Sequence, residues 1–235
     1  MMSTITVLIH IYYPGSWKRI SERCKTLLKN SANVIITACH DDVIAELNNT
    51  DAVILRVTNV GKDIGGKLTG MYYYLTFCTP TDYLVFIHDK TSPQTINPEF
   101  WFDKLLGIFE NERLDELMEL FNTNKLVGIA GSKLFLKNEY SQYEKKFNTT
   151  NNNILLKLIG QFGLTCKTYN YIGGTIFMAR SRIFETFFTT WSPFAIRESL
   201  ERGNVLDLKQ GTYTHSWERM FCFIAEDQGY KVVGV

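Results

Sequence analysis

The chain of 235 residues is long enough for one domain with a sizeable core, and its 45% hydrophobic and 21% charged residues are globular values that exclude wholesale disorder. A formal net charge of +1 removes the electrostatic argument for a nucleic acid partner. The sequence has no apolar run near the roughly 20 residues that a membrane-spanning helix needs, so we expect no transmembrane segment.

Strand and helix patterns alternate through the first half of the chain. Ile5–Ile11 is apolar and rich in β-branched residues, which is typical of a buried strand in a parallel sheet. Ser16 can cap a helix that starts at Trp17. The alternation predicts an open, mostly parallel α/β sheet with helices on both faces. Further strands are expected over Val34–Thr37, Ala52–Val57, Tyr83–Ile87 and Leu126–Ala130, and helices over Asp41–Leu47 and Gly65–Phe77, from Asn97-Pro98-Glu99 onward, and through Leu114 to Phe121.

The second half begins with a polar, Asn-rich segment at residues 137–153. We expect a mobile loop there, either an active-site lid or a plain surface insertion. The pair Gly173-Gly174 falls on a predicted strand, and a helix is predicted over Trp217–Gln228 after a flexible segment at Asp207–Thr214. The strand-like Lys231–Val235 ends the sequence, which leads us to expect a longer natural polypeptide.

We expect a single domain over residues 1–235, because the sequence shows neither an internal repeat nor an interdomain linker. The cysteines are odd in number, widely spaced and without a CxxC pair, which favours buried reduced thiols over a zinc site or a disulfide framework. That usage indicates a cytoplasmic protein. The cysteines are Cys24, Cys39, Cys78, Cys166 and Cys222.

A glycine-rich segment follows the third predicted strand and runs from Asn59 to Gly66. Ligands of open α/β sheets bind outside the carboxyl ends of the strands. Gly61 would let a backbone N–H group approach a phosphate or ribose, while the next helix presents its positive end. Asp63 could accept hydrogen bonds from a base or ribose. The segment matches neither a dinucleotide fingerprint nor a Walker A motif, and turning the chain is the alternative role for its glycines.

The strand over Tyr83–Ile87 delivers three polar residues, His88, Asp89 and Lys90, to the same edge of the sheet. Transfer of a sugar from a nucleoside diphosphate must neutralise charge on the departing diphosphate, and Mg²⁺, Mn²⁺ or a Lys side chain can do so. Asp89 is the candidate metal ligand, and Lys90 could contact phosphate directly. In the alternative interpretation, Asp89 caps the following turn and His88 packs nearby.

The last candidate residues lie in the C-terminal third. Gly173 and Gly174 are small enough for a sugar or an acceptor to lie against the backbone. Glu218 falls in the first turn of the predicted helix, and such a carboxylate could remove the acceptor's proton in an inverting sugar transfer. The helix dipole alone would also favour a Glu there. His215 is a candidate metal ligand with a structural role as the alternative, and Asp207 could touch the acceptor.

Taken in order, these blocks resemble the rhamnan synthesis protein F family, a group of rhamnosyltransferase-like proteins. The resemblance implies a single Rossmann-like domain of the glycosyltransferase A-type fold with an open mixed sheet. It also implies a nucleoside-diphosphate sugar donor, UDP- or dTDP-linked, and a glycan acceptor. The matching blocks are Asn59–Gly65, His88–Thr91, Gly173–Arg180 and His215–Val233.

By this resemblance, residues 1–130 form the nucleotide-sugar-binding half and residues 131–235 the acceptor-binding and catalytic half. Glu218 would be the base, and Asp89 would stand where this fold keeps a metal-binding Asp-x-Asp motif. One carboxylate stands there in place of two, so the need for Mn²⁺ or Mg²⁺ stays open. The residues expected to bind the nucleotide sugar are Asn59, Gly61, Asp63, His88, Lys90, Gly173 and Gly174.

Three function classes are weighed. An oxidoreductase is disfavoured because Tyr12-Tyr13-Pro14-Gly15-Ser16 lacks the dinucleotide glycine pattern, and a nucleotidyltransferase would carry a glycine- and basic-rich loop at that point. A degenerate sugar-binding domain is the second alternative, with Asp89 as a remnant, although Asp63 and Glu218 argue against it. We expect an inverting glycosyltransferase of polysaccharide synthesis, with L-rhamnose as the sugar that the family name implies.

Overall fold

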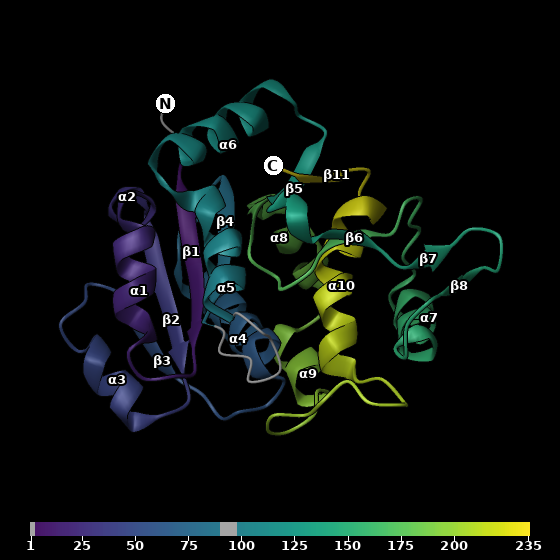
Figure 1. The fold of residues 1–235 in the computed structure, drawn as a ribbon, viewed down its shortest axis with the longest axis horizontal. Helices are drawn as coiled ribbons and strands as arrows, with labels where there is room; N and C mark the ends of the chain where they lie inside the picture. Colours follow the sequence, from purple (N-terminus) through teal and green to yellow (C-terminus); the bar gives the residue numbers. More distant parts are fainter. Residues whose placement is uncertain (1–2, 90–97) are drawn as a thin grey trace.

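The structure is a computed structural model that describes residues 3–89 and 98–235. The strands of its main sheet are β1 (Ile5–Ile11), β2 (Asn33–Ala38), β3 (Val53–Arg56), β4 (Tyr83–His88), β5 (Val127–Gly131), β10 (Phe177–Arg180) and β11 (Lys231–Gly234). They form one open sheet in the order β11-β5-β10-β4-β1-β2-β3 (Figure 1). Within the described residues, its strand pairs are parallel except those of β10, which runs antiparallel to β4 and β5. The predicted mostly parallel α/β sheet is therefore confirmed.

Helices cover both faces of the sheet. They are α1 (Ser16–Arg23), α2 (Lys25–Asn30), α3 (Asp41–Leu47), α4 (Lys62–Phe77), α5 (Pro98–Leu106), α6 (Asn111–Thr123), α7 (Asn152–Phe162), α8 (Ser181–Thr190), α9 (Pro193–Glu198) and α10 (Tyr213–Asp227), with short 3₁₀ helices η1 (Gly107–Phe109) and η2 (Lys133–Phe135). On β4, the Phe86 ring lies 5.2 Å from Phe184 of α8 and 5.6 Å from Phe221 of α10. Tyr83 lies an odd number of positions away and packs on the opposite face, 5.1 Å from Phe121 of α6.

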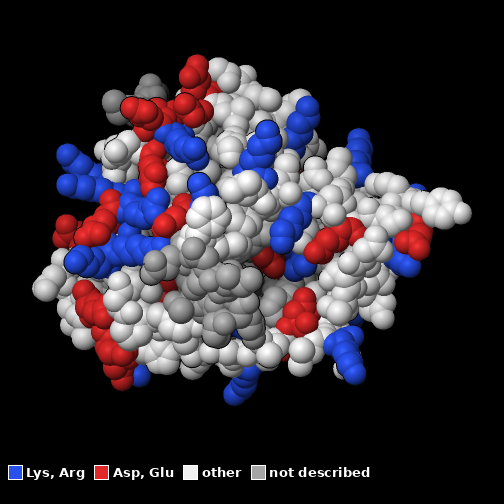
Figure 2. Space-filling model, viewed as in Figure 1, with Lys and Arg blue, Asp and Glu red and all other residues white. Residues whose placement is uncertain are grey.

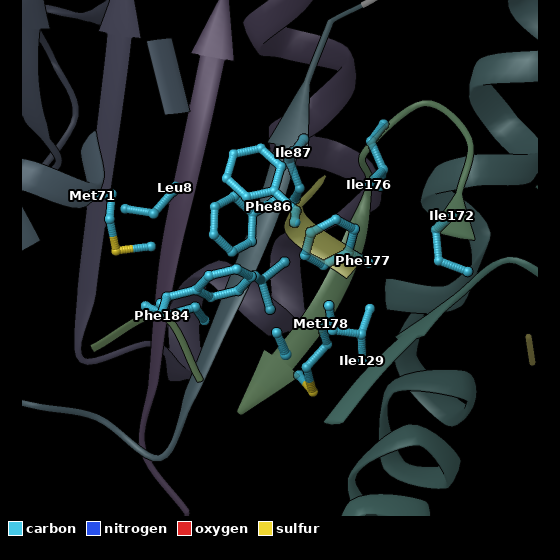
Figure 3. Close-up of a cluster of buried hydrophobic side chains, with 14 of the residues drawn as sticks. Leu8, Met71, Phe86, Ile87, Ile129, Ile172, Ile176, Phe177, Met178 and Phe184 are labelled. Carbon is cyan, nitrogen blue, oxygen red and sulfur yellow. The ribbon is translucent and has the colours of Figure 1, made fainter. Parts of the chain in front are cut away.

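One hydrophobic core extends through the sheet, from Ile5 on β1 to Val232 on β11. Figure 3 shows its centre, where Phe86 of β4 lies between Leu8 of β1 and Phe177 of β10. The Phe86 and Phe177 ring centroids are 5.0 Å apart. Fully burying one such side chain contributes roughly 1.5–3 kcal/mol, so the sheet and its helices stabilise each other through this layer.

The sheet has a topological switch point between β1 and β4. From β1 the chain proceeds outward through β2 and β3, and β4 then lies on the other side of β1. Ligands of open α/β sheets bind at the carboxyl ends of the strands beside such a point. Asp89 follows β4 there, and its carboxylate accepts hydrogen bonds from the N–H groups of Tyr12 (3.0 Å) and Tyr13 (2.6 Å), which follow β1. The two strand ends are thereby tied together.

Helices α1 and α4 begin at other residues than the sequence predicts. Ser16 is the first residue of α1 and does not cap it, because Gly15 occupies the cap position with a φ of 80°. Helix α4 begins at Lys62, three residues before the predicted start at Gly65. It also follows a glycine of positive φ, Gly61 (72°). Side-chain patterns do not reveal a left-handed backbone at a helix start, and glycine adopts it at little cost.

Residues 137–153 contain parts of three short strands and the start of α7. β6 (Leu136–Asn138) pairs with β9 (Asn170–Ile172), and β7 (Tyr140–Ser141) pairs with β8 (Lys146–Phe147) in a hairpin that projects from the right side of Figure 1. The mobility of this segment and its role as a lid stay predictions. The pair Gly173-Gly174 was predicted on a strand, but it lies in the turn between β9 and β10.

The surface drawn in Figure 2 carries intermixed basic and acidic side chains. Arg23 of α1, for example, pairs with both Asp103 and Glu110. Among the helices of the described residues, none is long and apolar enough to cross a membrane.

Candidate active site

The turn between β9 and β10 brings the candidate blocks together. The Gly174 N–H group donates a hydrogen bond to Glu218 Oε1 on α10 (2.5 Å). The next residue, Thr175, donates from its hydroxyl to Asp63 Oδ2 on α4 (2.9 Å). Nδ1 of His88, at the end of β4, lies 3.6 Å from the same Asp63 oxygen. Side chains from three other parts of the sequence, on α4, at the end of β4 and on α10, therefore gather at this turn.

A buried lysine that the sequence analysis missed holds this turn against α4. Lys67 Nζ donates hydrogen bonds to Asp63 Oδ2 (2.9 Å) and to the carbonyl oxygen (2.9 Å) and hydroxyl oxygen (2.5 Å) of Thr175. It also lies 3.0 Å from His88 Nδ1. The Lys67 side chain has no exposed surface. Its spacing of four from Asp63 is the local signal that could have indicated this ion pair, because such residues meet on one helix face.

The cluster keeps the Asp63 carboxylate ionised. Burial alone would raise the pKa of Asp63, but His88 and Lys67 outweigh burial through their charge and the Lys67 hydrogen bond, and hold that pKa well below its usual range. The Asp63 side chain keeps 22% of its surface exposed, which leaves it open to a ligand. The predicted contact between Asp63 and a nucleoside fits this geometry and stays a prediction.

Two pairs of adjacent residues at this site have positive φ: Gly174 (84°) with Thr175 (47°), and Gly61 (72°) with Lys62 (51°). Thr is β-branched and rarely adopts this region, because its Cβ substituents clash with the backbone. A strained residue of this kind costs about 1–3 kcal/mol and persists only where its surroundings fix it, often at a functional site. Lys67 supplies that constraint, since it binds both oxygens of Thr175.

The prediction that Glu218 lies in the first turn of its helix is wrong. Helix α10 begins at Tyr213 because the Thr212 hydroxyl accepts a hydrogen bond from an N–H group of the first turn (3.1 Å), which places Glu218 in the second turn. The helix dipole acts mainly within the first turn, so it does not explain this carboxylate. The Glu218 side chain is 22% exposed, and its oxygens accept hydrogen bonds from Gly174 N–H and from Arg219 Nη1 (2.9 Å).

Arg219 connects Glu218 to the segment at residues 137–153. Its guanidinium forms a two-pronged pair with Glu139, with N–O distances of 3.0 and 3.1 Å. The Tyr171 hydroxyl donates to Glu139 Oε1 (2.6 Å), and the Tyr171 ring lies 4.7 Å from the guanidinium. Burial alone would lower the pKa of Arg219, but Glu218, Tyr171 and Glu139 raise it above its ordinary value. No local pattern indicates this pair, because 80 residues separate Arg219 from Glu139.

Three of the predicted nucleotide-sugar residues are bound to neighbouring parts of the chain. The Gly61 N–H group donates to the Glu201 carbonyl (2.8 Å), and the Gly173 N–H group donates to a carbonyl at the end of η2 (2.8 Å). The Asn59 side chain donates to Asn204 Oδ1 (3.0 Å). These bonds fix the loops that surround the site. Direct contact of Asn59, Gly61 and Gly173 with a ligand stays a prediction.

The two predicted metal ligands are hydrogen-bonded within the chain, and their role at a metal site stays a prediction. Asp89 is 6% exposed, and both its oxygens accept hydrogen bonds from N–H groups of the loop after β1. Burial raises the pKa of Asp89 to about 6, although those bonds favour its charged form. His215 Nδ1 is bound to the Thr212 hydroxyl (2.6 Å). Residues 3–89 and 98–235 contain no group of three or more His, Cys, Asp or Glu that could hold a metal ion, and Lys90 lies outside the described residues.

Comparison with known proteins gives one result. The family model described as rhamnan synthesis protein F matches residues 1–230. No curated protein and no solved structure matched the chain. The family's description names the synthesis of rhamnan, a polysaccharide, which agrees with the predicted role in polysaccharide synthesis.

Proposed function

The chain belongs to the rhamnan synthesis protein F family, and from that premise we propose that it is an inverting glycosyltransferase. It would move a sugar from a UDP- or dTDP-linked donor to a glycan acceptor during polysaccharide synthesis. L-Rhamnose is the sugar that the family's description suggests. Glu218 would take the proton of the acceptor hydroxyl.

One observation carries this proposal: a single turn joins Asp63 to Glu218. Thr175 binds Asp63, and Gly174 binds Glu218. Asp63 follows β3 at the sheet edge where open α/β folds bind ligands. A donor held on the α4 side and an acceptor approaching on the α10 side would therefore meet above this turn.

The chemistry requires a base opposite the departing diphosphate. In an inverting transfer the acceptor oxygen attacks the anomeric carbon while a positioned carboxylate accepts its proton. Glu218 has the exposed surface that this needs. The amino end of α4, which begins at Lys62, would direct the positive end of the helix dipole toward the diphosphate. The proposal assigns no step to Mg²⁺ or Mn²⁺, because Asp89 is bound by the loop after β1.

A sugar-binding domain without catalysis is the second candidate, and one observation favours it. Each oxygen of Glu218 already accepts a hydrogen bond, from Gly174 N–H and from Arg219. A carboxylate held in this way could serve only to fix the turn. Each carboxylate oxygen nevertheless has a second lone pair, which can accept a proton.

The donor is tested first. The purified protein would be screened by thermal shift against UDP- and dTDP-sugars, NAD and free nucleoside triphosphates, each with and without Mn²⁺. A ligand that binds only the folded state raises the melting temperature, so we expect stabilisation by diphosphate sugars and not by NAD or triphosphates. A protein that responds to no diphosphate nucleotide would contradict the proposal.

Stereochemistry is tested next. With the stabilising donor and a rhamnose-terminated oligosaccharide as acceptor, NMR of the product should show an anomeric configuration opposite to that of the donor. A product of retained configuration would contradict the role of Glu218 as the base of an inverting transfer.

A further inference from the structure

Glu139 and Arg219 form an ionic chain that ends on Glu218 and that the proposed chemistry does not use. The guanidinium binds Glu139 through two nitrogen atoms and binds Glu218 through a third. The Arg219 side chain is 8% exposed and that of Glu139 is 25% exposed. Burying charges is costly, so an ion pair in such a place needs good geometry and further hydrogen bonds to persist. Tyr171 supplies one of these to Glu139.

Two hydrogen-bond donors, one on each oxygen, fix the Glu218 carboxylate. Oε1 is held by the Gly174 N–H group in the β9–β10 turn, and Oε2 is held by Arg219. A Glu side chain held at one oxygen could still change rotamers, whereas donors on both oxygens define the carboxylate plane. The planar fork of an arginine bound to Glu139 is itself fixed in orientation.

We propose that Arg219, held by Glu139, is a positioning residue that orients the Glu218 carboxylate toward the acceptor. This inference rests on the proposed role of Glu218 as the base. Glu139 balances the Arg219 charge, so that the base is not left beside an unpaired cation. Because Glu139 lies between β6 and β7, the placement of residues 137–153 then determines the placement of Glu218.

Steady-state kinetics test this role through the split between kcat and KM. Arg219→Met should lower kcat by about 100-fold, since a small misplacement of a catalytic group can cost that much, and should leave the donor KM nearly unchanged. Arg219→Lys should recover part of the rate, because an ammonium group can reach Glu218 but cannot form the fork with Glu139. Arg182→Met is the matched control, since Arg182 is exposed on α8, and it should keep the wild-type rate.

Chemical rescue separates positioning from general damage to the fold. Free guanidinium ion at concentrations below those that unfold the protein should restore part of the kcat of Arg219→Ala. Guanidinium should not restore the kcat of Glu218→Gln, because that variant lacks the base itself. Wild-type kcat in Arg219→Met, or a rate of Arg219→Ala that guanidinium does not change, would overturn the inference.

Hydrogen exchange tests the inference without any need for activity. The Gly174 amide is protected by its bond to Glu218, so Arg219→Met should exchange it faster than the wild type and Arg182→Met should not. The two claims fail separately. A wild-type protein that transfers no sugar from any donor contradicts the proposed function. Unchanged exchange of the Gly174 amide in Arg219→Met contradicts the positioning role of Arg219, whether or not transfer is observed. Should Arg219→Met not fold, Arg219→Met/Glu139→Gln removes both charges and carries the same expectations.

Discussion

At the residue scale, Lys67 buries a full positive charge among groups of Asp63, Thr175 and His88. Removing one member of such a buried pair leaves the other charge uncompensated. We therefore expect Lys67→Met to lower the free energy of unfolding by about 3 kcal/mol. Lys125→Met, at an exposed lysine, should change it by no more than about 0.5 kcal/mol. Urea denaturation at neutral pH makes the comparison, and equal stability of the two variants would contradict the structural role of Lys67.

Also at the residue scale, the burial of His10 predicts how the free energy of unfolding depends on pH. His10 is 2% exposed on β1, its Nδ1 lies 2.9 Å from the Thr37 hydroxyl, and its Nε2 has no hydrogen-bond partner among the described residues. Burial lowers the pKa of His10 from 6.5 to about 4, although Asp63 acts in the opposite direction. Between these values the unfolded chain binds more protons than the folded one. The contribution of neutral His10 to the free energy of unfolding is therefore complete above pH 6.5. It falls by on the order of 3 kcal/mol as the pH is lowered to 4.

The test compares the wild type with His10→Gln in denaturation series from pH 7 to pH 4. The difference between the proteins is the quantity to follow, because burial raises the pKa of Asp89 to about 6 and that group stabilises the fold as the pH falls. We expect the wild type to lose stability relative to His10→Gln across this range. A constant difference would show that His10 does not titrate in this way.

At the element scale, the β9–β10 turn depends on Gly174. Its φ is 84°, and an added Cβ would lie 2.7 Å from the Trp101 ring. Gly163 has a similar φ of 65° at the end of α7, but an added Cβ would meet nothing within 4 Å. Both Gly→Ala variants carry the left-handed strain of about 1–2 kcal/mol. Gly174→Ala should lose more stability than Gly163→Ala and should also lose transfer, because the N–H group that holds Glu218 must move. Transfer that is equal in the two variants would contradict this role of the turn.

Also at the element scale, some helices and strands could be predicted from the sequence and others could not. β1 was predicted to the residue, because all seven of its residues are buried and five of them are aliphatic. The start of α10 was missed because Tyr213 and Thr214 are poor helix formers, and Thr212 overrides them by capping the helix. The turn at Gly173-Gly174 was mistaken for a strand because apolar and β-branched residues follow it directly.

At the scale of the whole molecule, the site lies where distant segments converge on the carboxyl edge of the sheet. Asp63 and Glu218 could be nominated from sequence because each stands at a recognisable place beside a strand or on a helix. The link between them could not be predicted from sequence, because it includes the hydrogen bond from Thr175 to Asp63, which is 112 residues away along the chain. Arg219 and Glu139 carry no local pattern for the same reason. The bonds to Asp89 could not be predicted either, because they come from the loop after another strand. Its role as a metal ligand stays a prediction.

The central claim is that Glu218 is the base of a sugar transfer, and Glu218→Gln tests it most directly. Gln keeps the size of Glu and an oxygen that can accept the Gly174 N–H bond, so the fold and the donor site should be preserved. We expect the variant to show the wild-type thermal shift with the diphosphate sugar donor and a transfer rate lower by at least about 100-fold. A variant that binds donor and transfers sugar at the wild-type rate would contradict the account.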